Sequence, residues 1–510
     1  MTKAIADFPS APDKLTKHIL KLQNEIEQLR HQVKALTQEK ELLDSLLKQA
    51  HQARFSRKTE RFDTTQLSLL DEDMDVDIGT LETKLTTSLI DVPSKKDSPH
   101  RQNLPESLPR EEIRLEPNSS CCPDCGQPLR FVRDEINEVL DYIPGKFIVR
   151  KTIRPQYSCG GCQTIHSAQL PAQLIDKGQV APGLLAQIVI NKCVDHLPLY
   201  RQQKIFQRAG IDLPISTLCD WMGKTGVALE PLVGRMHELL LEQKVLHADE
   251  TPLTLLSAKK GKSTRGYLWA YATPATAKKR MVMFDCQPGR SAQYVKTFLR
   301  DFSGTLMVDD YAGYKGLFGD GQIKEAGCLA HVRRKFFEQY QANHNPLAKT
   351  ALDSIGELYK LERLIKERPP DKKHRWRNRY ARPILDTLHS WLEIQQRQIV
   401  PNSGMHKAIS HALKRWPALL SYLDDGNIPI DNNHIENCIR PIAVGRKNWL
   451  FAGSLQAGQR MAGIMSLLHT AKLNGIDPFN WLHCVLRQLP TWKNNRLDEL
   501  LPFAENFLAQ

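Results

Sequence analysis

Residues 245–256 read VLHADETPLTLL, and residues 304–314 read GTLMVDDYAGY. Each stretch contains an apolar, strand-forming run that meets acidic residues. The surrounding sequence predicts two more strands and a helix between these stretches, then a fifth short strand and a basic helix after them, at residues 266–275, 280–291, 291–302, 322–332 and 333–340. Three sequential strands, a helix and a fourth strand follow the order of a ribonuclease H-like domain, a mixed sheet flanked by helices.

Two carboxylates mark the ends of the central strands in this predicted sheet. Asp249 ends the first strand and Asp309 ends the fourth. These strands are neighbours in the predicted fold, so both carboxylates should project into one crevice. Like charges at that range repel unless a cation joins them. Hard oxygen ligands select Mg²⁺ or Mn²⁺ over zinc, so the pair predicts a divalent metal site.

A third carboxylate is expected from a helix that lies across the sheet, and Glu436 is the candidate. It lies in IDNNHIENCIRPIAVGRKNWLFAGS, residues 430–454, where Asp431 or Asn432 can cap a helix. Pro441 should end or kink that helix, which predicts a short one. Three acids holding two metal ions roughly 3.5–4 Å apart could clamp the attacking and leaving oxygens of an in-line phosphoryl transfer.

Each of these acids also has an alternative interpretation, and Asp249, between His247 and Glu250, could be a cap or a solvated turn at a strand end. Asp310 is the rival of Asp309, because a one-residue change of register exchanges which side chain faces the crevice. Glu436 could instead pair with the arginine four residues later. Cys328 and His331 form a C-x-x-H at helical spacing; a metal pair is possible, but without a partner pair nearby a packing role is favoured.

Basic side chains close to the acids in sequence are candidates for contacts with DNA phosphates. One group follows Glu436 directly and a second opens the basic helix at residue 333. The predicted DNA-binding residues are Arg440, Arg446, Lys447 and Asn448 in the first group, and Arg333, Arg334 and Lys335 in the second.

Two C-x-x-C pairs, in CPDCG and CGGC, lie within residues 112–170. Short alternating runs between them, NEVLDYIP and KFIVRKTIRPQYS, predict strands. Two C-x-x-C turns on a small sheet can place their four sulfurs at the corners of a tetrahedron, the geometry that Zn²⁺ prefers. The predicted zinc ribbon uses Cys122, Cys125, Cys159 and Cys162, with Cys121 as a possible substitute. The alternative is a redox pair, but no βαβ pattern surrounds these motifs.

The N-terminal region carries a heptad. Leucines recur at one seam position from Leu15 to Leu43, and branched residues occupy the other, which favours a parallel two-stranded coil. We therefore expect a homodimer or a higher oligomer. The basic run RFSRKTERF (54–62) and a segment rich in Ser, Pro and Lys follow, and the latter is typical of a linker.

Residues 200–222, YRQQKIFQRAGIDLPISTLCDWM, have the pattern of a helix-turn-helix. Gly210 should break the first helix and Ser216 should cap the second. Residues near the start of the second helix would then approach a DNA major groove. Helix pairs of this kind also occur in enzymes that read no DNA, and spacing alone leaves that alternative open.

These patterns predict a multidomain α+β chain. Helical periodicity between the predicted metal ligands indicates a helical insertion in the catalytic core. The expected units are a coiled coil (13–52), a basic segment and linker (53–111), the zinc ribbon (112–170), a helix-turn-helix-like region (171–240), the catalytic core (241–340 and 426–470) split by the insertion (341–425), and a C-terminal helical segment (471–510).

Composition agrees with a partner that is a polyanion. The chain of 510 residues carries a formal net charge of +13, which points toward nucleic acid, although charge alone leaves open a basic protein without a special partner. It has no secretory signal and no apolar run near the roughly 18 residues of a membrane span. Eleven cysteines in 510 residues suit a metal site in a reducing cytosol better than a disulfide framework, so we expect a cytoplasmic protein.

The sequence resembles the transposases of the bacterial insertion-sequence family sixty-six, which are of the DDE type. The resemblance covers nearly the whole chain, including HADET, VDDYAGY, GCLAHVRRKF, residues 430–454 and the C-terminal MAGIMSLLHTAKLNGIDPFNWL. It implies an acid triad at Asp249, Asp309 and Glu436, cleavage and strand transfer at the element's inverted ends into target DNA, and accessory proteins from the same element. One departure is Asp310, where the family usually has a small residue such as glycine.

Two other functions fit parts of the sequence. A DNA-binding relative without catalysis would share the zinc ribbon and basic charge, but the three acids argue against it. A stand-alone ribonuclease H-like nuclease would cut DNA without joining it. The predicted coil and zinc ribbon favour a machine that pairs DNA ends.

Overall fold

The computed structural model describes residue 27, residue 145 and residues 147–158, 165–168, 171–175, 178–256, 263–319 and 321–508. The chain divides into two compact units, one of residues 78–169 and one of residues 1–77 with 170–510. Apart from residue 27, the predicted coil lies outside the described residues, as do the predicted zinc cysteines and Cys121. None of the helices in the described part of the chain combines the length and apolar character of a membrane span.

The described part of the smaller unit contains one hairpin. Strand β1 (Gln156–Ser158) pairs antiparallel with β2 (Ile165–Ser167). The prediction of a strand through KFIVRKTIRPQYS was too long, because residues 147–155 belong to no strand.

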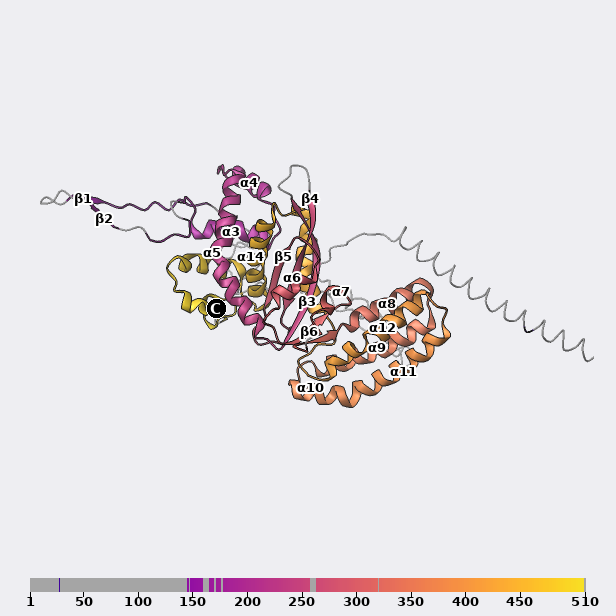
Figure 1. Cartoon of the computed structure of the whole chain (residues 1–510). Helices are drawn as coiled ribbons and strands as arrows, with labels where there is room; N and C mark the ends of the chain where they lie inside the picture. The colour runs from indigo at the N-terminus through magenta and orange to yellow at the C-terminus, as the bar shows by residue number, and fades with distance from the viewer. Residues whose placement is uncertain are drawn as a thin grey trace, which may run out of the picture. The chain divides into compact units, whose positions relative to one another are not determined.

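The larger unit is built on a mixed five-stranded sheet with the order β5-β4-β3-β6-β7 (Figure 1). The strands are β3 (Val245–Leu256), β4 (Ser263–Ala272), β5 (Val282–Gln287), β6 (Gly304–Val308) and β7 (Ile323–Gly327). β3 lies antiparallel to β4 and parallel to β6, and β7 extends the parallel side. The prediction that the first and fourth strands are central neighbours is therefore confirmed.

Short helices connect the strands. Helix α6 (Ala292–Phe298) begins after Ser291, whose hydroxyl accepts the backbone N–H of Gln293, and α7 (Ala312–Lys315) follows β6. The predicted fifth strand was too long. β7 ends at Gly327 and α8 (Leu329–Asn343) begins two residues later, so Cys328 is its N-cap residue.

Four helices share one hydrophobic core with the sheet: α3 (Pro182–Cys193), α5 (Ile215–Leu241), α14 (Leu455–Leu473) and α15 (Pro478–Gln488). Of these, α14 contacts β5 and β3 directly. Helix α14 also protects the edge strand β5, because the hydroxyls of Ser466 and Thr470 accept backbone N–H groups of Phe284 and Val282. The chain then continues through η3 (Leu489–Thr491), η4 (Asn494–Leu500) and α16 (Glu505–Leu508).

The helix-turn-helix-like segment forms two helices, α4 (Leu199–Arg208) and α5. Gly210 has a φ of 79°, a left-handed conformation that glycine adopts freely, and it ends the first helix as predicted. The predicted cap was wrong: Pro214 precedes the first turn of α5, and no side chain caps it. Helix α5 also runs for 27 residues, because buried side chains along it pack into the core throughout.

The predicted insertion is helical and has a core of its own (Figure 1). It comprises α9 (Pro346–Ile365), α10 (Pro370–Trp376), the π-helical η1 (Arg377–Ala381), α11 (Arg382–Gln398), α12 (Gly404–Leu420) and η2 (Ser421–Leu423). Met307 of β6 and Ala326 of β7 belong to this second core, so the insertion packs directly on the parallel side of the sheet.

Helix α13 (Asn433–Trp449) follows the insertion and packs against β3. It continues through Pro441, so the prediction of a short helix was wrong. A proline in a helix interior removes one backbone hydrogen bond and costs about 3 kcal/mol. Ile442 and Trp449, which follow the proline, are buried, and their packing offsets that cost.

Candidate active site

The prediction that Asp249 ends the first strand was wrong: the ladder with β4 continues to Leu256, so Asp249 lies in the middle of β3, and it is half-buried. Its Oδ1 accepts the backbone N–H of Glu250 at 2.8 Å. Burial raises the pKa of Asp249 well above its usual range, and the negative charges of Glu250, Glu436 and Asp309 raise it further. The three predicted acids are thus close enough to influence one another electrostatically.

Asp309 directly follows β6, the parallel neighbour of β3. Its Oδ1 accepts the backbone N–H of Tyr311 at 2.9 Å, which fixes the turn into α7. Beyond this turn contact, its backbone carbonyl accepts a hydrogen bond from Arg415 of α12 at 3.4 Å.

Asp310 lies in a different environment from Asp309. Four cationic or basic groups lie at ion-pair distance from its carboxylate: Lys315 Nζ at 3.5 Å, His411 Nδ1 at 3.6 Å, Lys414 Nζ at 3.7 Å and Arg415 Nη1 at 3.8 Å. Burial alone would raise the pKa of Asp310, but the charges of Arg415, Lys315 and Lys414 outweigh it and lower the pKa.

Glu436 occupies the first turn of α13. Its Oε1 lies 3.6 Å from Nε2 of His331, and its Oε2 lies 3.6 Å from Nη2 of Arg334, both on α8. Burial lowers the pKa of His331. Within the described part of the chain, Oε1 of Glu436 is buried without a hydrogen-bond partner, as is Oδ1 of Asp310. A buried carboxylate oxygen without a donor is the kind of atom that a cation satisfies.

Asn432 joins the three segments that carry the site, a role that sequence reasoning missed. Its side-chain amide donates to the carbonyl of Ala248 at 3.0 Å, and its Oδ1 lies 2.7 Å from Nδ1 of His247. Its backbone N–H donates to the sulfur of Cys328 at 3.2 Å. The residue was considered only as a helix cap, yet it fixes the start of α13 against β3 and the start of α8. Cys328 accordingly has the packing role that was favoured for it.

Glu250 lies next to Asp249 but alternates to the opposite face of β3. Only 2% of its side chain is exposed. Arg290 Nε donates to its Oε1 at 2.7 Å, and the hydroxyl of Tyr314 donates to its Oε2 at 2.7 Å. These partners neutralise Glu250 within the protein, whereas Asp249 faces α13.

The donor set suits a hard divalent cation, since it consists of carboxylate oxygens. Among the described residues, however, no group of three His, Cys, Asp or Glu side chains is close enough together to hold one ion.

The predicted DNA-contacting residues differ in accessibility. Lys335 of α8 and Lys447 and Asn448 of α13 are exposed, while Arg334, Arg440 and Arg446 are partly exposed. Arg333 was predicted to contact DNA, but only 3% of it is exposed and its guanidinium stacks over Phe337. Burial in the helical core therefore excludes Arg333 from a DNA-facing surface.

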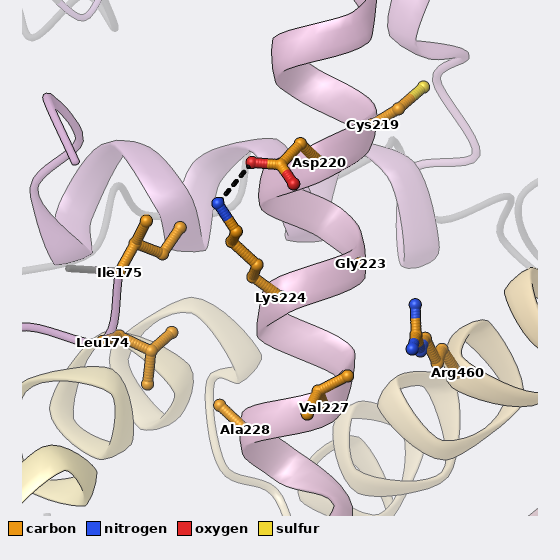
Figure 2. Close-up of a pocket in the computed structure, with 9 residues that line it drawn as sticks. All are labelled: Leu174, Ile175, Cys219, Asp220, Gly223, Lys224, Val227, Ala228 and Arg460. Atoms are coloured by element: carbon orange, nitrogen blue, oxygen red, sulfur yellow. Dashed lines mark ion pairs between the residues drawn. The ribbon is translucent and has the colours of Figure 1, made fainter. Parts of the chain in front are cut away.

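A pocket elsewhere on the larger unit contains none of these residues. Its lining includes Cys219, Asp220 and Lys224 of α5 and Arg460 of α14, and Asp220 pairs with Lys224 at 2.8 Å (Figure 2). Figure 2 shows Leu174 on one side of α5 and Arg460 on the other. The pocket thus belongs to the second helix of the helix-turn-helix-like segment.

Comparison with known families and proteins identifies the chain's relatives. Family models match at residues 42–113 (Transposase C of IS166 homeodomain), 119–163 (zinc-finger binding domain of transposase IS66), 177–460 (Transposase IS66 family) and 466–503 (IS66 C-terminal element). The residue 177–460 match includes Asp249, Asp309 and Glu436.

Similar proteins occur in Sinorhizobium fredii (strain NBRC 101917 / NGR234), where each is named as uncharacterized. The protein y4jD is 33% identical over 504 residues, covering 94% of this chain and 96% of the relative. The protein y4qI is 31% identical over 534 residues, with 99% and 98% covered, and y4hP is 31% identical over 426 residues, with 79% and 77% covered. Since the main family model spans more than half of the sequence, the chain belongs to the IS66 transposase family.

Proposed function

We propose that this protein is a DNA transposase whose catalytic core is ribonuclease H-like and whose metal ligands are Asp249, Asp309 and Glu436. It would cut DNA at the ends of its insertion sequence and join those ends to target DNA. The observation that carries the proposal is the meeting of β3, β6 and the first turn of α13, with the charges of the other two acids raising the pKa of Asp249.

The environments of the neighbouring acids support this choice of ligands. Asp310 is surrounded by cationic groups and Glu250 is bound by Arg290 and Tyr314, so each already has a charge partner. Asp249 is instead crowded by like charges, which a divalent cation would relieve. An acid that must be ionised to bind metal releases its proton on binding, so Asp249 would exchange a proton for the cation.

The residues of the core would share the work of phosphoryl transfer. Two divalent cations at such a site would activate the attacking hydroxyl and stabilise charge on the leaving oxygen. Arg334 and Lys335 of α8 and Arg440 of α13 would hold the phosphates of the DNA strand beside the acids. Asn432 would keep the helix that carries Glu436 in register with the strand that carries Asp249.

The proposal is tested with full-length protein, Mg²⁺, a linear duplex carrying the inverted ends that flank the gene, and a supercoiled plasmid as target. We expect strand breaks at the ends and covalent joining of those ends to the plasmid, both detected by sequencing. Cleavage without joining would indicate a nuclease, and binding without either reaction would indicate an inactive relative. Either outcome would contradict the proposed transposase.

The N-terminal part of the chain would assemble the complex on DNA. We propose that residues 13–52 dimerise the chain as a coil and that Cys122, Cys125, Cys159 and Cys162 bind structural Zn²⁺. The match to the zinc-finger model over residues 119–163 supports the second proposal. Accessory proteins from the same element would complete the assembly.

Zinc analysis checks the ribbon directly. Purified protein should contain about one Zn²⁺ per chain, the stoichiometry of a four-thiolate structural site. A double substitution, Cys122→Ser with Cys159→Ser, should remove it, because one ligand is lost from each C-x-x-C turn. Substituting Cys219→Ser, an exposed cysteine of α5, serves as the control and should leave the zinc content intact. Protein that contains no zinc when prepared without chelators would refute the ribbon.

A further inference from the structure

The helical insertion contributes to the edge of the candidate active site. Helix α12 presents His411, Lys414 and Arg415 to Asp310, which directly follows the proposed ligand Asp309. Lys315 of α7 completes this group. We call Lys315, His411 and Lys414 together the basic wall; its two lysines are exposed, and the side chain of His411 is 16% exposed. These residues come from segments about 100 positions apart in sequence, so no local motif reveals them.

The two lysines of the basic wall, together with Arg415 behind it, carry more positive charge than the two carboxylates they contact. Lys315, Lys414 and Arg415 face two carboxylates, those of Asp310 and Glu325. Arg415 is only 7% exposed and is engaged with Glu325, so it anchors the group from within. By contrast, 46% of the Lys315 side chain and 61% of the Lys414 side chain are exposed. Two lysines can therefore reach an outside anion.

The four contacts with Asp310 are too long for strong hydrogen bonds, so the basic groups around it keep donor capacity that this carboxylate does not use. All four distances to its carboxylate are 3.5–3.8 Å, and its buried Oδ1 has no hydrogen-bond partner in the described part of the chain. Burial and the charge of Lys335 lower the pKa of His411 to about 4. His411 is therefore neutral near pH 7 and can donate one N–H to an anion without adding charge.

We propose that the basic wall binds a phosphate of the DNA strand at the active site, and that Asp310 is its internal counter-ion. This inference rests on the proposed function. Arg415, which also donates to the carbonyl of Asp309, joins the phosphate site to the metal site. The insertion would thereby position the DNA backbone relative to the carboxylates, and Asp310 would not be a metal ligand.

The first experiment measures how salt weakens binding of the full chain to a labelled DNA duplex in EDTA. The plot of log K against log salt has a negative slope, and each lost phosphate contact reduces the magnitude of that slope by about 0.9. Lys414→Gln should reduce the magnitude by about this amount, while Lys414→Arg should retain the wild-type slope. Lys372→Gln, at an exposed lysine of α10, is the matched control and should also retain it. An unchanged slope in Lys414→Gln would overturn the proposal.

The second experiment separates the counter-ion from a ligand. Asp310→Asn removes a negative charge from the basic wall, so duplex binding in EDTA should become severalfold tighter. Electron paramagnetic resonance should count as much bound Mn²⁺ in Asp310→Asn as in the wild type, and less in Asp309→Asn. Equal loss of Mn²⁺ in both variants, or weaker duplex binding by Asp310→Asn, would refute the counter-ion role. Because the DNA-binding measurements need no cleavage, they remain decisive even for a chain that fails as a transposase.

Discussion

Glu436→Gln should lower the rate of Mg²⁺-dependent cleavage at the element's ends by about a thousandfold or more, equivalent to about 4 kcal/mol of transition-state stabilisation. The amide keeps the shape of the side chain but removes the negative charge that would bind the cation. Arg334 and His331 lie 3.6 Å from the present carboxylate, so polar contact with α8 is retained. DNA binding in EDTA should persist, since the lysine and arginine side chains that are proposed to contact the DNA phosphates are unchanged.

The matched control for this substitution is Glu338→Gln, which removes the same charge from an exposed position on α8. Its cleavage rate should stay within about twofold of the wild type, since surface substitutions of this kind have small effects. If Glu436→Gln retained a tenth or more of the wild-type rate, Glu436 would not be a metal ligand. A loss of DNA binding in the same variant would instead indicate a structural role in orienting α13.

The sheet could be predicted because its signals are local. Apolar, strand-forming runs within residues 245–256 and 304–314 identified β3 and β6, and the order of strands and helix along the chain made them neighbours. The residues at which helices and strands begin and end were less predictable, because packing between segments that are distant in sequence decides them. The fifth strand was predicted to run through Cys328, but it ends one residue earlier, because Cys328 is the N-cap residue of α8 and its sulfur accepts the N–H of Asn432.

Helix α13 shows how tertiary contacts override a local signal. Pro441 predicted a break, but the helix continues to Trp449. Gly445 explains part of this result: a Cβ at this position would come within 2.3 Å of the ring of His196, so only glycine lets α13 pack so closely there. Neither His196 nor its unusual φ of 55° could be inferred from the motif around Glu436.

The acids of the candidate site could be proposed from the sequence, but their surroundings could not. Carboxylates expected at the ends of two strands pointed to Asp249 and Asp309, while the choice of Glu436 also required the family resemblance. The surroundings of these acids were not predictable, because they depend on pairs such as Asn432 with Ala248 and Asp310 with Lys414. Each pair joins residues more than 100 positions apart, and sequence periodicity carries no information at that range.

Asp249→Asn should abolish cleavage and, at the same time, stabilise the metal-free protein. The asparagine can still accept the N–H of Glu250, but it carries no charge to be buried beside Glu250, Glu436 and Asp309. Removing a charge from such a site should raise the free energy of unfolding by about 1 kcal/mol or more near pH 8. Chemical denaturation of both proteins in EDTA measures this difference.

The pH dependence gives the sharper test, because the pKa of Asp249 is raised in the folded state. A raised pKa means that the folded protein holds this proton more tightly than the unfolded chain. Its stabilising effect is therefore fully present below the ordinary pKa of aspartate and is lost as the pH rises through the raised value. The stability advantage of Asp249→Asn should accordingly grow from pH 5 to pH 8, while Asp301→Asn, at an exposed position, should show no such trend.

Magnesium should reverse this difference. Because the cation would replace the proton on Asp249 in the proposed site, Mg²⁺ should stabilise the wild type more at pH 8 than at pH 5, and should stabilise Asp249→Asn little at either pH. A carboxylate whose role is to cap the backbone N–H of the next residue would behave in the opposite way, since losing it destabilises a protein at every pH above its pKa. If Asp249→Asn proved less stable than the wild type in EDTA at pH 8, Asp249 would be such a cap and the metal site would have to lie elsewhere.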